Sequence, residues 1–121
     1  MIILILTFFK GTLMPISITP ENHEKEVTQS SSPVILDIYA TWCGPCQQMN
    51  PILHELEKEF EGQYKFAKLN VDEGRDISIK QYGVTSVPTF VFIKDGVIKG
   101  KETGYMSKDT MKEKIVAAFG E

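Results

Sequence analysis

Residues 34–46 read VILDIYATWCGPC, and the architecture of this 121-residue chain can be inferred outward from them. Residues 34–40 are almost all apolar and rich in β-formers, which predicts a central strand buried on both faces. From residue 44 to about residue 61, apolar side chains recur at helical spacing opposite charged ones. A buried strand followed directly by an amphipathic helix is typical of an α/β sheet, and Cys43 and Cys46 fall at the junction.

The rest of the chain supplies further strands and helices. Apolar patterns predict strands at residues 15–19, 64–71, 89–94 and 97–102, and helices from Thr19-Pro20 to about Gln29, over 77–82 and over 107–119. Asp95-Gly96, between the last two strands, is a strong hairpin signal. The early alternation implies parallel strands and the hairpin adds an antiparallel pair, so we expect one mixed sheet in one domain.

Composition narrows the class of protein. The chain is 42% hydrophobic and 24% charged, which excludes a disordered or low-complexity chain. It has 13 Lys and Arg against 16 Asp and Glu, so its net charge is −3 and nucleic acid is not expected as a main partner. Two cysteines are too few for a disulfide framework.

The N-terminus carries a separate apolar run at residues 2–9. This run is far too short to cross a bilayer, so no stable membrane span is expected. It could be a secretory signal, but no Lys or Arg precedes it and no small-residue cleavage site follows it. Alternatively, translation begins at Met14 and leaves residues 1–13 as an upstream appendage, which is the interpretation we favour. Residues 1–14 are therefore predicted to be an extension and residues 15–121 the domain.

The Cys-x-x-Cys pair is the motif that carries chemistry. Cys43 is predicted at or next to the helix N-cap, and Cys46 three residues later lies on the same helical face, within reach of a disulfide. The unpaired amides and the dipole of the helix N-terminus favour a thiolate at Cys43. Half of a zinc site is an alternative, but His23 and His54 are the only imidazoles and neither is spaced as a second ligand pair. A purely structural disulfide is also disfavoured, because so small a loop removes little chain entropy.

Asp37 is the one charged residue in the central strand. A carboxylate there would be poorly solvated, so its pKa should be raised and it could accept the Cys46 proton, directly or through water. The alternative is an aspartate at a strand end that faces solvent.

Several segments at matching spacings resemble the thioredoxin family. They are WCGPC at 42–46, the strand that contains Asp37, Pro51, AKLNV at 67–71, Val87-Pro88-Thr89 and Gly104. The resemblance covers about residues 15–121 and implies the thioredoxin fold, an α/β fold with a central five-stranded mixed sheet flanked by four helices. It also implies that Cys43 is an exposed attacking thiol, that Cys46 is the resolving thiol, and that Lys68 is the partner of Asp37.

The same resemblance implies a substrate site around Cys43. It predicts a cis peptide bond before Pro88 and a shallow apolar patch formed by Trp42, Gly44, Pro45, Val87, Pro88 and Gly104. No cofactor is expected apart from the redox-active disulfide Cys43–Cys46. Some positions depart from the family pattern: Gln47 stands where Lys or Arg often follows the second cysteine, Tyr39 stands where tryptophan is frequent, and Thr85-Ser86 varies in the loop before Val87.

These features predict a cytoplasmic, monomeric protein-disulfide reductase. Its expected partners are disulfide-containing proteins and a flavin- and NADPH-dependent thioredoxin reductase as electron donor. One alternative is a binding subunit of the same fold whose cysteines are dispensable. Another is an exported thiol reductase guided by residues 2–9.

Overall fold

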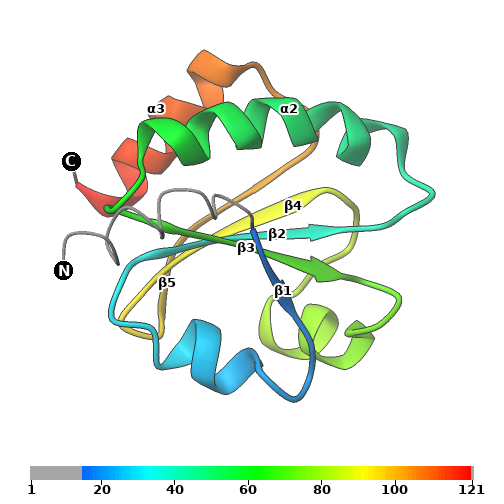
Figure 1. The fold of residues 1–121 in the computed structure, drawn as a ribbon. Coiled ribbons are helices and arrows are strands. Elements are labelled where there is room, and N and C mark those ends of the chain that lie inside the picture. The colour runs from blue at the N-terminus through cyan, green and yellow to red at the C-terminus, as the bar shows by residue number, and fades with distance from the viewer. Residues whose placement is uncertain (1–14, 121) are drawn as a thin grey trace, which may run out of the picture.

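The computed structural model describes residues 15–120, which form one five-stranded sheet (Figure 1). The strands are β1 (Ile16–Ile18), β2 (Val34–Tyr39), β3 (Lys65–Asn70), β4 (Thr89–Lys94) and β5 (Val97–Thr103). Their spatial order is β1-β3-β2-β4-β5. The pairs β1–β3 and β2–β3 are parallel, whereas β2–β4 and β4–β5 are antiparallel, so the mixed sheet expected from the sequence is confirmed.

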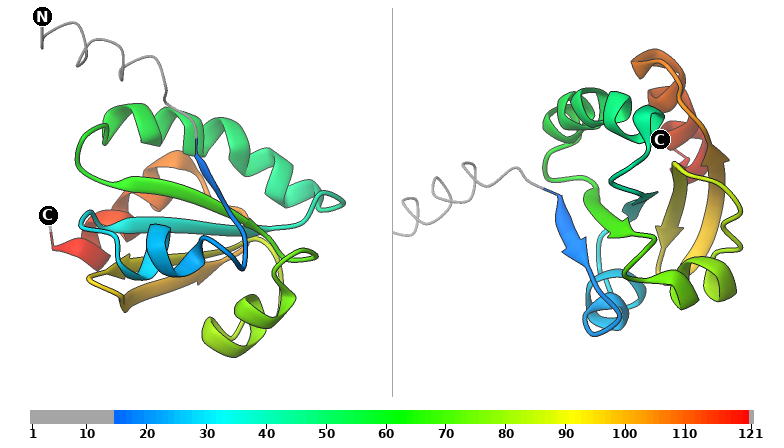
Figure 2. Two further views of the ribbon diagram at one scale, coloured as in Figure 1. Left: turned by 60° about the horizontal axis from the view of Figure 1, so that its bottom comes forward. Right: turned by 90° about the vertical axis from the view of Figure 1, so that its right-hand side faces the viewer.

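Four helical segments flank the sheet within the described residues. They are η1 (Glu24–Thr28), α2 (Gly44–Glu59), η2 (Ile77–Gln81) and α3 (Lys108–Phe119). The helices α2 and α3 cover one face, and the short segments η1 and η2 lie on the other, as the views in Figure 2 show. The predicted helices are thus present. The ends of α2, η2 and α3 lie close to the prediction, whereas η1 begins at Glu24, later than the start predicted at Thr19-Pro20.

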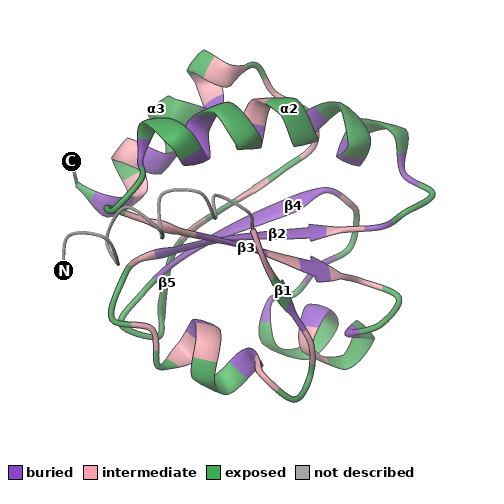
Figure 3. Ribbon diagram, in the orientation of Figure 1, coloured by how far each residue is buried: buried purple, intermediate pink, exposed green. Residues whose placement is uncertain are grey.

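The alternation of side chains along the central strands builds two cores. On β2, Ile35 packs under α2 and α3, whereas Leu36 and Ile38 pack on the face that η1 and η2 cover. All but the last residue of β2 and of β4 are buried, while β5 is largely exposed at the sheet edge (Figure 3). Because Asp37 is two residues beyond Ile35, it points toward the α2 face.

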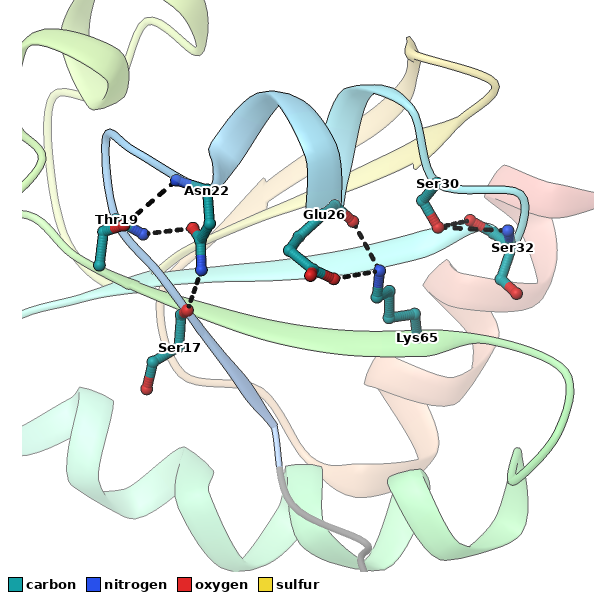
Figure 4. A network of polar contacts seen from close by, with 7 residues as sticks. All are labelled: Ser17, Thr19, Asn22, Glu26, Ser30, Ser32 and Lys65. Atoms are coloured by element: carbon teal, nitrogen blue, oxygen red, sulfur yellow. Dashed lines mark hydrogen bonds and ion pairs between the residues drawn. The ribbon is translucent and has the colours of Figure 1, made fainter. Parts of the chain in front are cut away.

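The turn from β1 into η1 is held by local polar contacts (Figure 4). The backbone N–H of Asn22 donates to Thr19 Oγ1 at 3.2 Å, and its side-chain amide donates to the Ser17 carbonyl at 2.9 Å. On the other side of η1, Lys65 Nζ lies 2.9 Å from Glu26 Oε1 and ties the segment to β3. The helix start expected at Thr19 is therefore wrong: η1 begins at Glu24 with His23 as its N-cap, and Thr19 instead closes the preceding turn through Asn22.

Some sequence expectations need adjustment. The apolar faces predicted for α2 and α3 are not fully buried: Ile52 and Val116 are half-buried and pack against the edge of the core. No helix in the described part of the chain is long and apolar enough to cross a membrane. The interpretation of residues 1–14 as an extension falls outside the described residues.

Candidate active site

Cys43 and Cys46 meet at the N-terminal tip of α2. Cys43 is the N-cap residue with extended backbone angles, Gly44 and Pro45 form the start of the first turn, and Cys46 completes it. Pro45 is tolerated there because its missing N–H would have no acceptor within the helix. The two cysteines are joined in a disulfide, with their Cα atoms 5.3 Å apart.

The helix terminus interacts with the first sulfur directly. The backbone N–H of Cys46 donates to Cys43 Sγ at 3.1 Å, so an otherwise orphaned amide is directed at this atom. In the reduced protein, this amide and the dipole of the helix favour negative charge on Cys43.

The cysteines are less exposed than the family pattern implied. Cys43 is 6% exposed and Cys46 is 3% exposed in this disulfide-bonded state. The expectation of an exposed Cys43 is thus wrong for the oxidised form, because Cys43 packs with Ala40 and Cys46 and lies against Val87. Cys43 is still the more accessible of the two sulfur-bearing residues.

A second loop reaches the site from the sheet. The Val87–Pro88 peptide bond is cis, as expected, and Cys43 Sγ lies 3.7 Å from the Val87 carbonyl oxygen. The Pro88 carbonyl in turn accepts from the Gly104 N–H at 2.9 Å. Pro88 itself, expected on the surface of the patch, is buried because the chain enters the core there at the start of β4. The exposed part of the patch is formed by Trp42, Gly44 and Pro45, with Val87 and Gly104 half-buried beside them.

The side chain of Trp42 is held by a hydrogen bond to the loop that follows β3. Its side chain is 70% exposed, and its indole Nε1 donates to Asp72 Oδ2 at 2.9 Å. Trp42, Asp72 and Val87 line a groove of about 560 Å³ beside the disulfide. Asp72 was not singled out in the sequence, because a contact between residues 30 positions apart leaves no local pattern.

Asp37 is buried, as expected, with only 3% of the residue exposed. Desolvation by burial raises its pKa to about 7, against the opposing effect of the nearby Lys68 ammonium. Lys68 is the register partner of Asp37 on β3, and its Nζ lies 3.8 Å from Oδ2. Asp37 Oδ1 accepts no hydrogen bond from any residue that the structure describes. The neutral form of the Asp37 carboxyl is therefore favoured in the folded protein much more than it would be in water.

Lys68 has a shorter contact that the sequence did not reveal. Its Nζ donates to Asn50 Oδ1 on α2 at 2.8 Å and lies 4.5 Å from the centre of the Tyr39 ring. The Asp37–Lys68 pair was expected, but its arrangement depends on a third residue from another element.

The two histidines lie away from the sulfurs. His23 is buried, with its Nε2 2.6 Å from Tyr82 Oη, and burial lowers its pKa. His54 lies on α2, where it lines a cavity together with Asp37 and Lys68. Among residues 15–120, no group of three or more His, Cys, Asp or Glu side chains is arranged to hold a metal ion.

Comparison with known proteins decides the family. A family model described as Thioredoxin matches residues 14–117. The chain belongs to the thioredoxin family. It is 36% identical over 96 residues to the thioredoxin of Pseudomonas aeruginosa, covering 79% of this chain and 88% of the relative. It is 37% identical over 99 residues to the thioredoxin of Rickettsia felis, covering 82% and 93%. It is also 44% identical over 89 residues to the chloroplastic M-type thioredoxin of Pisum sativum, covering 74% and 51%.

Family membership and the close cysteine pair together establish the chemistry. This thioredoxin-family chain is a thiol-disulfide oxidoreductase, and the fold expected from the resemblance is the fold observed. The alternative of a binding subunit with dispensable cysteines is not favoured, because the paired cysteines stand at a helix terminus with an amide directed at the first sulfur.

Proposed function

We propose that this thioredoxin-family chain is a protein-disulfide reductase in which Cys43 attacks and Cys46 resolves. The Cys43 thiolate attacks one sulfur of a substrate disulfide, forms a mixed disulfide and releases the other substrate sulfur as a thiolate. Cys46 then attacks Cys43 Sγ, releases the second substrate thiolate and leaves Cys43–Cys46 oxidised. Two electrons pass to the substrate in each cycle. The observation that carries this proposal is the Cys46 N–H directed at Cys43 Sγ at 3.1 Å.

Asp37 acts in this proposal as the base for Cys46. A carboxyl whose pKa is about 7 is suited to exchange a proton with a thiol near neutral pH. Its burial on the α2 face of β2, under the helix that carries Cys46, supports this role. Lys68 on the neighbouring strand lies 3.8 Å from Asp37 Oδ2, and its positive charge partly offsets the rise in the pKa of Asp37 that burial causes.

Substrates are proposed to dock on the patch around the disulfide. Trp42 supplies a large exposed apolar surface, while Gly44 and Pro45 at the helix tip and Gly104 present no bulky side chains there. An added Cβ at Gly44 or Gly104 would meet no atom within 4 Å, so the space above these glycines is open to a substrate backbone. The Val87 carbonyl is placed beside Cys43 Sγ, where an extended peptide could pair with this backbone edge.

Insulin reduction tests the proposal. Wild-type protein with dithiothreitol should precipitate insulin B chain rapidly, and Cys43→Ser should reduce the rate to the background given by dithiothreitol alone. Cys46→Ser should accumulate a mixed disulfide through Cys43. Equal turnover by Cys43→Ser and wild type would refute the reductase.

The proposed electron donor is a flavin- and NADPH-dependent thioredoxin reductase, and the proposed compartment is the cytoplasm. Wild-type protein added to such a reductase and insulin should cause steady NADPH oxidation, which Cys43→Ser should not support. For the compartment, the N-terminal residue of the protein purified from its source cell is decisive. A chain that begins at Met14 and stays in the cytoplasm agrees with the proposal, whereas processing after residues 2–9 together with export favours the exported reductase.

A further inference from the structure

The Lys68 ammonium is shared between two elements. From β3 it reaches toward α2, where Asn50 Oδ1 accepts its hydrogen bond at 2.8 Å. Its distance to Asp37 Oδ2 is 3.8 Å, beyond a hydrogen bond. Because an ammonium has only donors, the oxygen of the Asn50 amide must face it, and the amide nitrogen cannot replace it. The Tyr39 ring, 4.5 Å away, supports the ammonium from a third side.

The surroundings of Asp37 contain few other charges. A cavity of about 390 Å³ on the α2 face is lined by Asp37, Lys68, Asn50, His54 and Glu57, among others. On the other side, β4 places Phe90 opposite Asp37, and Tyr39 follows on β2 itself. Glu57 is buried and desolvation raises its pKa, which reduces its charge at a given pH. Lys68 Nζ, 3.8 Å from Asp37 Oδ2, is thus the cation beside this carboxyl, and its position determines how strongly the carboxylate is stabilised.

We propose that Asn50 is a positioning residue that holds the Lys68 ammonium away from Asp37, so that the carboxyl remains a proton acceptor for Cys46. This inference rests on the base role of Asp37 in the proposed function. The side-chain hydrogen bond of Asn50 is to Lys68, so the effect of Asn50 on Asp37 is exerted through Lys68.

The physical argument is a competition between two oxygens for one ammonium. Without Asn50, the Asp37 Oδ2 atom, 3.8 Å from Lys68 Nζ, is an acceptor close enough for the ammonium to move to. Closing a gap of 3.8 Å to a hydrogen-bonded ion pair strengthens the attraction, and burial of the carboxyl limits screening by water. A stronger pair favours the carboxylate, and we expect the pKa of Asp37 to fall by roughly 0.5 to 1 unit in Asn50→Ala.

The test follows the ¹³C resonance of the Asp37 carboxyl during a pH titration of the full chain. The oxidised protein is used, because neither cysteine titrates in it. Asn50→Ala should lower the pKa of Asp37, whereas the matched control Gln48→Ala, which removes another exposed amide from α2, should leave it unchanged. In a Lys68→Met background, Asn50→Ala should have no further effect. An unchanged or raised pKa in Asn50→Ala, or an equal fall without Lys68, would overturn the proposal.

A kinetic measurement separates this inference from the proposed function. Stopped-flow resolution of the mixed disulfide by Cys46 should have a pH profile that shifts to lower pH in Asn50→Ala, in parallel with the titration of Asp37. If Asp37→Asn resolves the mixed disulfide at the wild-type rate, Asp37 is not the base for Cys46. The pKa of Asp37 in Asn50→Ala then still tests independently whether Asn50 positions Lys68. If Asp37→Asn is slow while Asn50→Ala leaves the pKa unchanged, the base role survives and Asn50 has no positioning role.

Discussion

Asp37 is a carboxyl residue buried beneath α2, with 3% of the residue exposed. Burial raises its pKa from 3.8 to about 7, so the folded protein binds a proton that the unfolded chain releases between these pH values. Folding stability therefore falls as pH rises from about 4 to about 7, and the loss is complete above the pKa of the folded state. A difference of about three units corresponds to about 4 kcal/mol at 1.36 kcal/mol per unit. Because the buried Asp37 carboxyl lowers folding stability at neutral pH, its presence fits a functional role better than a structural one.

We predict that Asp37→Asn stabilises the oxidised protein in a pH-dependent way. The amide keeps the shape of the side chain but cannot be charged, so the variant lacks the loss of stability that wild type undergoes as pH rises. Its gain in free energy of unfolding over wild type should be about 2 to 3 kcal/mol larger at pH 8 than at pH 5. Urea unfolding at both pH values measures it. Glu61→Gln, which removes an exposed carboxyl, is the control, and a gain for Asp37→Asn that is the same at both pH values would contradict the prediction.

The indole of Trp42 provides a second residue-scale test, because this is the one tryptophan of the chain. Its Nε1 donates to Asp72 Oδ2 at 2.9 Å. Asp72→Ala removes the acceptor, so the exposed indole should become more mobile, with a lower fluorescence anisotropy and a KM for insulin raised a few-fold. Asp72→Asn retains a side-chain oxygen and should stay close to wild type. Identical anisotropy in Asp72→Ala and wild type would show that the hydrogen bond does not restrain the ring.

At the residue scale, the sequence alone identifies those functional residues whose neighbours along the chain form a recognisable pattern. Asp37 stands out within an apolar strand, and Cys43 and Cys46 form a motif at a predicted helix start. Asn50 and Asp72 were missed because their partners, Lys68 and Trp42, lie 18 and 30 positions away on other elements. The low exposure of Cys43 was missed for the same reason, since Val87 approaches it from a distant loop.

At the scale of elements, the local sequence determines where most helices and strands begin and end. Asp95 and Gly96 have φ angles of 53° and 76°, the left-handed conformation that a two-residue hairpin turn requires. The hairpin between β4 and β5 could therefore be predicted from this Asp-Gly dipeptide. The exact ends of η1 and β3 could not, because tertiary contacts and not propensity determine where such short elements end. The packing of η1 against β3 through Glu26 and Lys65 is one such contact.

The helix α3 offers an element-scale prediction through its N-cap. Ser107 has extended backbone angles, and its hydroxyl oxygen accepts from the Thr110 N–H at 3.2 Å. Ser107→Ala leaves this amide without its side-chain acceptor and should lower the free energy of unfolding by about 1 kcal/mol. Ser107→Asp supplies another acceptor and should retain most of the stability. Urea unfolding of the three proteins measures this, and equal losses in both variants would show that the cap is not the cause.

At the scale of the whole molecule, residues 15–120 form a sheet with a core on each face. The family match begins at residue 14 and the first strand at Ile16. We propose that residues 15–121 are the thioredoxin domain and residues 1–14 an extension to it. A chain that begins at Met14 should then unfold at the same urea concentration as the full chain and reduce insulin at the same rate. A clear loss of either property would assign residues 1–13 a part in the domain.

The reduction potential of the Cys43–Cys46 pair tests the proposed reductase most directly. Equilibration of the full chain with dithiothreitol buffers of known ratio, followed by alkylation of free thiols, measures it. A reductase that passes electrons to protein disulfides needs a reducing pair, and we expect a value of about −230 mV or lower, in the range of thioredoxins near −270 mV. A value near about −120 mV, typical of strong disulfide donors, would mean that the pair oxidises its substrates and would contradict the proposed direction of electron flow.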